Sequence, residues 1–94
     1  MEQRIALAGG LGSLTLREEG PRLWARAELP DDGRGLYKVW LTGRNGRALL
    51  GTLVPESGGR LAAERTFTAD ALRRQGTWPV TGGTAELTFS FHND

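Results

Sequence analysis

Two tryptophans that alternate with cations are the residues whose types and spacing could bind a ligand or a partner. Trp24 lies two residues from both Arg22 and Arg26, and Trp40 lies two residues from Lys38. Side chains two apart share one side of an extended strand, so each indole has a cationic neighbour. An indole beside a cation can stack on a base or a sugar ring, or form the centre of a protein interface. These five residues are therefore the candidate binding residues.

A hairpin would have to bring the two tryptophans together. If segments 22–29 and 35–43 are antiparallel neighbours, Trp24 and Trp40 become cross-strand neighbours. Three interpretations then stay open: a stacking platform for bases or sugars, the centre of a protein or dimer interface, or a second small core covered by a helix or another sheet. Whether the two indoles are buried distinguishes between them.

No group of residues in the sequence indicates catalysis or metal binding. The chain has no cysteine and one histidine, His92, so thiol chemistry and disulfides are excluded and a zinc site lacks ligands. The acidic pairs Glu18-Glu19 and Asp31-Asp32 lie at predicted turns, where solvated carboxylates are expected. The glycine-rich segment 9–12 lacks the Lys-Ser/Thr of a phosphate-binding loop and predicts a hairpin turn. We expect a non-enzymatic protein without a cofactor or a metal.

Length and charge restrict the function further. The 94 residues, of 10.2 kDa, predict one domain spanning 1–94. Twelve basic and 11 acidic residues give a net charge of +1, which excludes binding of a polyanion by bulk charge alone. The first apolar run is too short for a signal peptide, and no segment approaches a membrane span. Together with the absence of cysteine, this predicts a soluble cytoplasmic protein without a membrane partner.

Glycine-containing turns divide the chain into short strands. Gly-Gly and Asn-Gly pairs supply the positive φ angles that tight hairpins require, and runs of alternating polarity lie between them. The turns are expected at Gly9-Gly10, Glu19-Gly20-Pro21, Asp32-Gly33, Asn45-Gly46, Gly58-Gly59 and Gly82-Gly83. The eight predicted strands are 4–8, 11–18, 22–29, 35–43, 47–54, 60–67, 77–81 and 84–92.

Two of these turns predict a register. A two-residue turn at Asn45-Gly46 places Leu41 opposite Leu50, and Trp40 over Gly51 on the other face. The Gly82-Gly83 pair likewise predicts a hairpin of the last two strands, with Val80 beside Ala85 and Trp78 beside Leu87. The result is an all-β fold, a single small antiparallel meander that forms a sandwich or a barrel-like roll.

One short helix is predicted over 69–75. Thr68 is a suitable N-cap, and Gly76 is placed to end the helix. Phe67 and Leu72 have the spacing of a hydrophobic staple. Two turns of helix are too short to be stable alone, so we expect the helix to be held by packing, as a plug or a crossover between sheets.

One hairpin resembles a known kind of domain. Segment 35–43 reads GLYKVWLTG and segment 49–55 reads LLGTLVP. This pattern resembles small uncharacterised bacterial all-β domains, and it is similar to the extracytoplasmic β-domain of some anti-sigma factors. The chain lacks the zinc motif and membrane segment of a whole anti-sigma factor. The resemblance implies an all-β bacterial domain and assigns no functional residue.

The sequence therefore favours a protein-binding or assembly module, with self-association as one form of assembly. The alternative is an OB-like domain that binds nucleic acid or an oligosaccharide. Its contacts would be Arg22, Arg26, Lys38, Arg44 and Arg47. The net charge of +1 counts against the alternative, because neutralising phosphates requires a basic surface.

Overall fold

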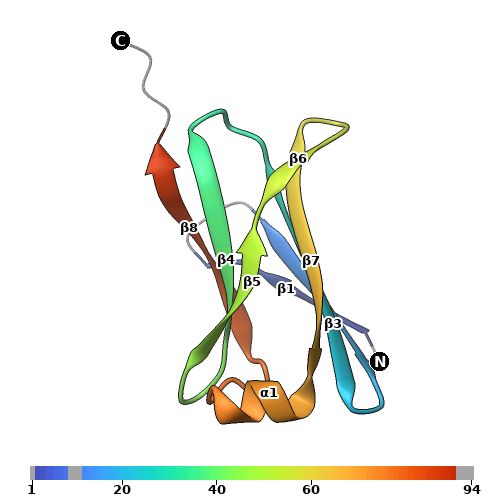
Figure 1. The fold of residues 1–94 in the computed structure, drawn as a ribbon. Helices are drawn as coiled ribbons and strands as arrows, with labels where there is room; N and C mark the ends of the chain where they lie inside the picture. Colours follow the sequence, from blue (N-terminus) through green and yellow to red (C-terminus); the bar gives the residue numbers. More distant parts are fainter. Residues whose placement is uncertain (1, 9–11, 91–94) are drawn as a thin grey trace.

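The computed structural model describes residues 2–8 and 12–90 and shows two antiparallel sheets packed face to face (Figure 1). One sheet, here called sheet A, has the strand order β1-β2-β3-β7-β6, and sheet B has the order β5-β4-β8. The strands are β1 (Glu2–Ala6), β2 (Ser13–Glu19), β3 (Arg22–Pro30), β4 (Gly35–Thr42), β5 (Arg47–Thr52), β6 (Val54–Glu56), β7 (Arg60–Thr68) and β8 (Gly82–Ser90). The predicted all-β class is confirmed, and of the two architectures left open the sandwich is the one found, since the sheets do not close into a barrel.

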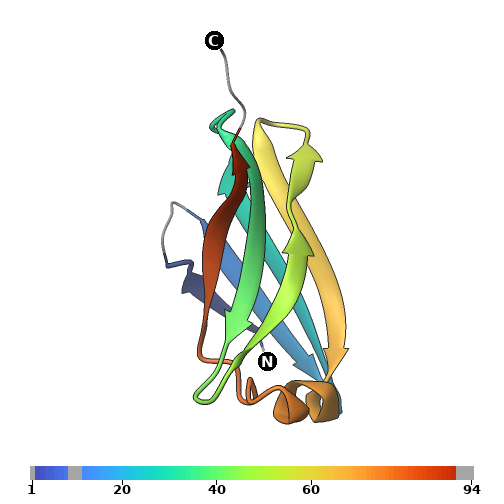
Figure 2. The same cartoon turned by 60° about the vertical axis from the view of Figure 1, so that its left-hand side comes forward.

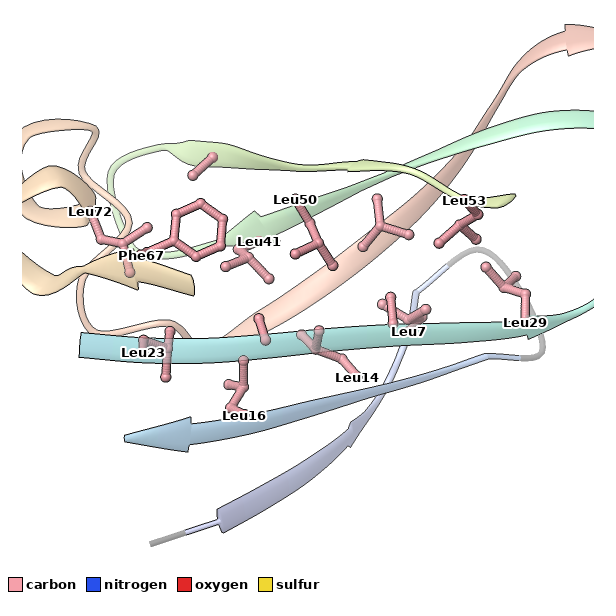
Figure 3. Close-up of a cluster of buried hydrophobic side chains, with 14 of the residues drawn as sticks. Leu7, Leu14, Leu16, Leu23, Leu29, Leu41, Leu50, Leu53, Phe67 and Leu72 are labelled. Carbon is pink, nitrogen blue, oxygen red and sulfur yellow. The ribbon is translucent and has the colours of Figure 1, made fainter. Parts of the chain in front are cut away.

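Alternating side chains build the core between the sheets (Figure 3). In β3, Leu23, Ala25, Ala27 and Leu29 are all buried, as the alternation predicts. Sheet B contributes buried residues of β4 and β5 from the opposite side. In β2, β3, β4 and β5, buried residues thus alternate with more exposed ones, as expected for two packed antiparallel sheets.

The chain crosses between the sheets three times within the described residues, so its strand order departs from a simple meander. β3 leads to β4 in the other sheet, and β7 leads to β8 through the helix. The predicted strand 47–54 is divided into β5 and β6, which belong to different sheets. Leu53 lies at this division, is 1% exposed, and donates its N–H to the Tyr37 carbonyl at 2.9 Å. These crossings tie the two layers into one core.

Helix α1 (Ala69–Arg74) confirms the predicted helix and closes one end of the sandwich (Figures 1 and 2). The hydroxyl of Thr68 accepts the N–H of Ala71 at 3.2 Å, as an N-cap should. Gly76 follows the C-cap with φ +74°. Phe67 and Leu72 are both buried in the core, so the short helix is held by packing.

The predicted two-residue turn at Asn45-Gly46 is wrong. The loop spans 43–46, closed by a bond from the Gly43 N–H to the Gly46 carbonyl at 3.0 Å. Its flanking pair is Thr42 and Arg47, so Leu41 lies opposite Ala48. The loop packs on the chain after α1. A side chain on Gly43 would place its Cβ 2.6 Å from the Cα of Thr77. Tertiary contact, not turn chemistry, therefore sets the loop length.

A β-bulge then changes the register of β4 and β5. The shift lies between Val39 and Trp40. Val39, not Trp40, is the partner of Gly51, and Trp40 lies opposite Leu49. The prediction that Trp40 lies over Gly51 is therefore wrong, because a bulge adds one residue that uniform alternation does not contain.

The predicted strand 77–81 is absent from the described structure, and the hairpin at Gly82-Gly83 is wrong. Gly82 and Gly83 instead begin β8, opposite Thr42 and Leu41 of β4. A Cβ on Gly83 would lie 2.9 Å from side-chain atoms of the core. Gly83 thus lies in close packing with the core rather than in a turn. The predicted pairings of Val80 with Ala85 and of Trp78 with Leu87 do not form. The Gly9-Gly10 turn and His92 lie outside the described residues.

Candidate binding surface around Trp24

The structure places the two candidate tryptophans on opposite outer surfaces of the sandwich. Trp24 belongs to β3 in sheet A, and Trp40 belongs to β4 in sheet B. The predicted hairpin of these strands is wrong, because the connection between them passes from one sheet to the other. Leu23 and Ala25 point into the core, so Trp24 points outward by alternation. Trp40 points outward for the same reason, because its neighbours Val39 and Leu41 are buried. The five candidate residues thus form two groups: Arg22, Trp24 and Arg26 on sheet A, and Lys38 and Trp40 on sheet B.

Trp40 is covered by its neighbours on sheet B. The guanidinium of Arg47 lies 4.0 Å from the centre of its ring. Leu49 and Thr84 flank it on the two neighbouring strands. Its Nε1 is buried, and no described group accepts a hydrogen bond from it. An indole covered in this way stabilises the outer surface of sheet B by packing and cation–π contact. Lys38 lies on the same side, opposite Glu86.

Trp24 forms part of an open hollow of about 620 Å³ on the outer surface of sheet A. Across the sheet it lies opposite Arg17 of β2 and Thr66 of β7. The Arg17 guanidinium lies 4.9 Å from the ring centre and also pairs with Glu2 at 2.9 Å. The lining residues are Arg17, Glu19, Pro21, Arg22, Trp24 and Thr66. We call these six residues the Trp24 surface.

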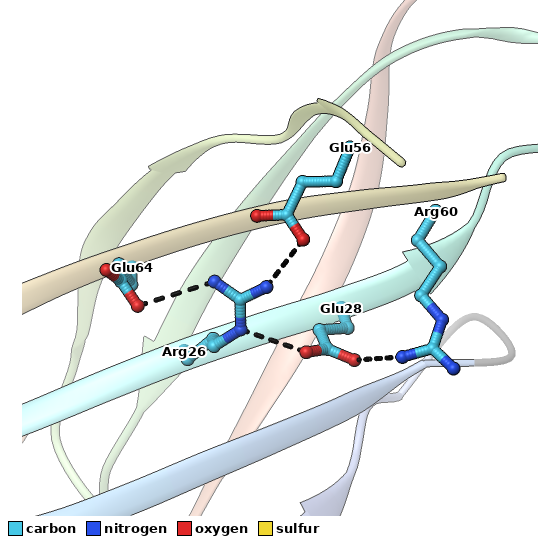
Figure 4. A network of polar contacts seen from close by, with 5 residues as sticks. All are labelled: Arg26, Glu28, Glu56, Arg60 and Glu64. Carbon is cyan, nitrogen blue, oxygen red and sulfur yellow. Dashed lines mark hydrogen bonds and ion pairs between the residues drawn. The ribbon is translucent and has the colours of Figure 1, made fainter. Parts of the chain in front are cut away.

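Arg26 is held by carboxylates beyond the Trp24 surface (Figure 4). Its guanidinium pairs with Glu28 at 2.9 Å, Glu56 at 2.6 Å and Glu64 at 3.4 Å. Glu28 also pairs with Arg60 at 3.1 Å. The hydrogen bond from Arg26 lowers the pKa of Glu28, and the bonds to Glu28 and Glu56 raise the pKa of Arg26. Arg26 therefore joins β3 to β6 and β7 across sheet A.

Two further hollows among the described residues do not combine an open aromatic ring with free space for a ligand. One of about 560 Å³ lies at the other end of sheet A and is lined by charged and small residues, including Arg4, Glu28 and Arg60. The other, beside Trp78, measures about 110 Å³ and is below the size of usual ligand sites. Trp78 itself is partly buried against the core. The Trp24 surface is accordingly the candidate site.

The acidic pair Asp31-Asp32 supports the loop between β3 and β4. Asp31 and Asp32 each accept a backbone N–H two residues on, from Gly33 and Arg34, both at 3.0 Å. The hydroxyl of Tyr37 donates to Asp32 at 2.6 Å. That bond lowers the pKa of Asp32 and raises the pKa of Tyr37. Within residues 2–8 and 12–90, no group of three or more His, Cys, Asp or Glu side chains is arranged to hold a metal ion.

Comparisons with protein families, with curated proteins and with solved structures find no match to this chain. In the described part of the chain, no helix has the length and apolar character needed to cross a membrane.

Proposed function

We propose that this domain is a binding or assembly module that contacts a protein partner through the Trp24 surface. The observation that carries the proposal is the open hollow in which Trp24 is flanked by Arg17 and Arg22. Tryptophan and arginine are the residue types enriched at the energetic centres of protein interfaces. Trp24 points away from the core, which Leu23 and Ala25 fill.

Charge pairing favours a protein over a nucleic acid as the partner. Arg17 pairs with Glu2, and Glu19 lies opposite Arg22 at the end of the β2–β3 ladder. Arg26 is occupied by three carboxylates. A surface with cations and carboxylates in alternation complements a protein surface of mixed charge, whereas nucleic acid requires an excess of cations.

The basic residues of the OB-like alternative also do not share one surface. Lys38 and Arg47 belong to sheet B and Arg44 to its end loop, whereas Arg22 and Arg26 belong to sheet A. A titration with a single-stranded oligonucleotide at low salt tests the alternative directly. We expect no binding, and binding that weakens as salt rises would contradict the proposal of a protein partner.

Site-specific photo-crosslinking in the native cell tests the proposed surface. A photoreactive amino acid at Thr66, beside Trp24, should give a discrete cross-linked product that is lost when Trp24→Ala is introduced. The matched control is Thr52, an exposed threonine on sheet B opposite Lys38. Equal products from Thr66 and Thr52, or products unaffected by Trp24→Ala, would contradict the proposal.

A further inference from the structure

The edge strands of the two sheets differ in whether another strand can pair with them. β6 is three residues long and contains Pro55. β5 packs beside β7, whose Arg65 donates to the Leu49 carbonyl at 3.2 Å. The beginning of β8 is paired with Ala8, whose N–H donates to the Gly83 carbonyl at 2.9 Å. Short length, proline and covering all hinder edge-to-edge association, and β1, the remaining edge strand, has none of them.

The backbone groups of alternate residues in β1 point to the free edge of sheet A. β1 ends the strand order of this sheet, and all five of its residues pair with β2 without a register shift. The next residue, Leu7, donates its N–H to the Gly12 carbonyl at 3.0 Å, so Leu7 and the odd-numbered residues before it bond towards β2. Ala8 accordingly bonds away from β2, to β8. The N–H and carbonyl groups of Glu2 and Arg4 therefore face outward.

The side chains of Glu2 and Arg4 place opposite charges two residues apart on this edge. Both are exposed, and their partners in β2 alternate with the buried residues of that strand, so both lie on the outer surface of sheet A. Glu2 pairs with Arg17 at 2.9 Å. Among the described residues no carboxylate forms an ion pair with Arg4, although its charge helps to lower the pKa of Glu28. The Arg4 guanidinium can therefore take a carboxylate from outside the chain.

We infer that β1 pairs antiparallel with β1 of a second copy of this chain, about a two-fold axis at Gln3. In this register Glu2 of each copy lies opposite Arg4 of the other, so opposite charges meet twice. Both are hydrogen-bonded pairs, because the backbone groups of Glu2 and Arg4 face outward. Gln3 is exposed and meets its own copy, and an amide side chain can both donate and accept. An interface that satisfies itself about a two-fold axis is the commonest form of assembly.

Charge selects this register over its neighbours. Charged side chains usually protect an edge strand, and they do so here in every arrangement that brings like charges together. A shift by two residues places Arg4 opposite Arg4 of the second copy, or Glu2 opposite its Glu2. Parallel pairing in register also places each charge opposite its own kind. Among the symmetric registers, the one centred on Gln3 gives each charge its complement. None of the six residues of the Trp24 surface belongs to β1.

Sedimentation velocity over a range of concentrations, with one matched pair of variants, tests the inference. The wild type should rise from 10.2 kDa towards twice that mass as concentration increases. Arg4→Glu brings like charges together in both pairs and should weaken dimerisation about tenfold or more. Arg44→Glu is the control, because it makes the same change of charge at an exposed position in the loop 43–46, away from β1. It should dimerise like the wild type.

Exchanging the two charges of β1 gives the reverse test. A variant with both Glu2→Arg and Arg4→Glu keeps the net charge of +1 and again places opposite charges in both pairs. It should therefore dimerise more strongly than Arg4→Glu alone. The exchange also removes the bond between Arg17 and Glu2, but this ion pair is exposed and contributes little to stability.

All three variants should keep the fold, because the substituted side chains are exposed, and circular dichroism checks this. Hydrogen exchange gives a second measurement: the amide at position 4 should become more protected with concentration in the wild type and in Arg44→Glu, but not in Arg4→Glu. A wild type that stays monomeric at every concentration would overturn the inference. So would an Arg4→Glu variant that dimerises as well as Arg44→Glu, or a charge-exchanged variant that stays as weak as Arg4→Glu.

Discussion

At the scale of single residues, the bond between Tyr37 and Asp32 connects the loop after β3 to β4. The Tyr37 hydroxyl donates to Asp32 at 2.6 Å, and the carboxylate also accepts the N–H of Arg34 at 3.0 Å. Both bonds favour the charged carboxylate, so its pKa lies below the ordinary value of 3.8. The folded loop therefore favours the charged form of Asp32.

We expect Tyr37→Phe to return the pKa of Asp32 towards its ordinary value. A carboxyl whose pKa is lowered on folding stabilises the fold above its unfolded pKa, and this stabilisation is lost as pH falls through the folded pKa. The pKa of Tyr37 is raised on folding. Tyr37 therefore stabilises the fold at pH values below 10.0, its ordinary pKa, and this stabilisation is lost as pH rises through its folded pKa. NMR titration of the Asp32 carboxyl in both proteins measures the shift. An unchanged Asp32 pKa in Tyr37→Phe would show that the bond does not hold the carboxylate.

At the scale of elements, helix α1 shows how one capping residue fixes the end of a strand and the start of a helix. Thr68 ends β7 and caps α1 through its bond from Ala71. We expect Thr68→Ala to lower the free energy of unfolding by about 1 kcal/mol. Thr68→Ser keeps the capping oxygen and should cost much less. Urea unfolding of the two variants and the wild type measures the difference. Equal losses of unfolding free energy in Thr68→Ala and Thr68→Ser would exclude the capping bond as the cause.

Local signals account for the elements that could be predicted from the sequence. The N-cap, the terminal glycine and the apolar pair at 67 and 72 specify α1 without reference to the rest of the chain. Alternation likewise specifies which side of β3 is buried. The loop 43–46 could not be predicted, because Gly43 and Gly46 are needed for close approach to the backbone of 75–77, a segment distant in the sequence. The bulge between β4 and β5 could not be predicted either, because the alternation of polar and apolar residues does not show where an extra residue is inserted.

The candidate site was predicted in part for the same reason. The outward direction of Trp24 follows from its apolar neighbours in β3 alone. Its companions Arg17 and Thr66 come from β2 and β7, so they depend on the sheet order, and β7 is remote in sequence. The same holds for Arg26, whose partners Glu56 and Glu64 are brought to it by β6 and β7. Strand order, which single-strand patterns do not contain, decides which side chains share a surface.

At the scale of the whole molecule, the two sheets share one core and cannot bury their apolar sides separately. Leu14 and Leu23 of sheet A belong to the same buried cluster as Leu41 and Leu50 of sheet B. The chain passes between the layers at the β3–β4 loop, at Leu53 and through α1. A small protein with one continuous core is expected to unfold in a single cooperative step.

The three tryptophans offer a direct test of this cooperativity, because Trp24 and Trp40 report on different sheets. Two single-tryptophan proteins are needed: one keeps Trp24 and carries Trp40→Phe and Trp78→Phe, and the other keeps Trp40 and carries Trp24→Phe and Trp78→Phe. We expect the fluorescence of each to follow the circular dichroism of the same sample through urea unfolding, with one common midpoint in each protein. Each comparison is made within one sample, so a change in stability caused by the substitutions cannot imitate a separation of the two signals. A sheet A signal that changes before the dichroism, with a sheet B signal that changes after it, would show that the layers unfold separately. In that case the crossings would not couple the Trp24 surface to sheet B.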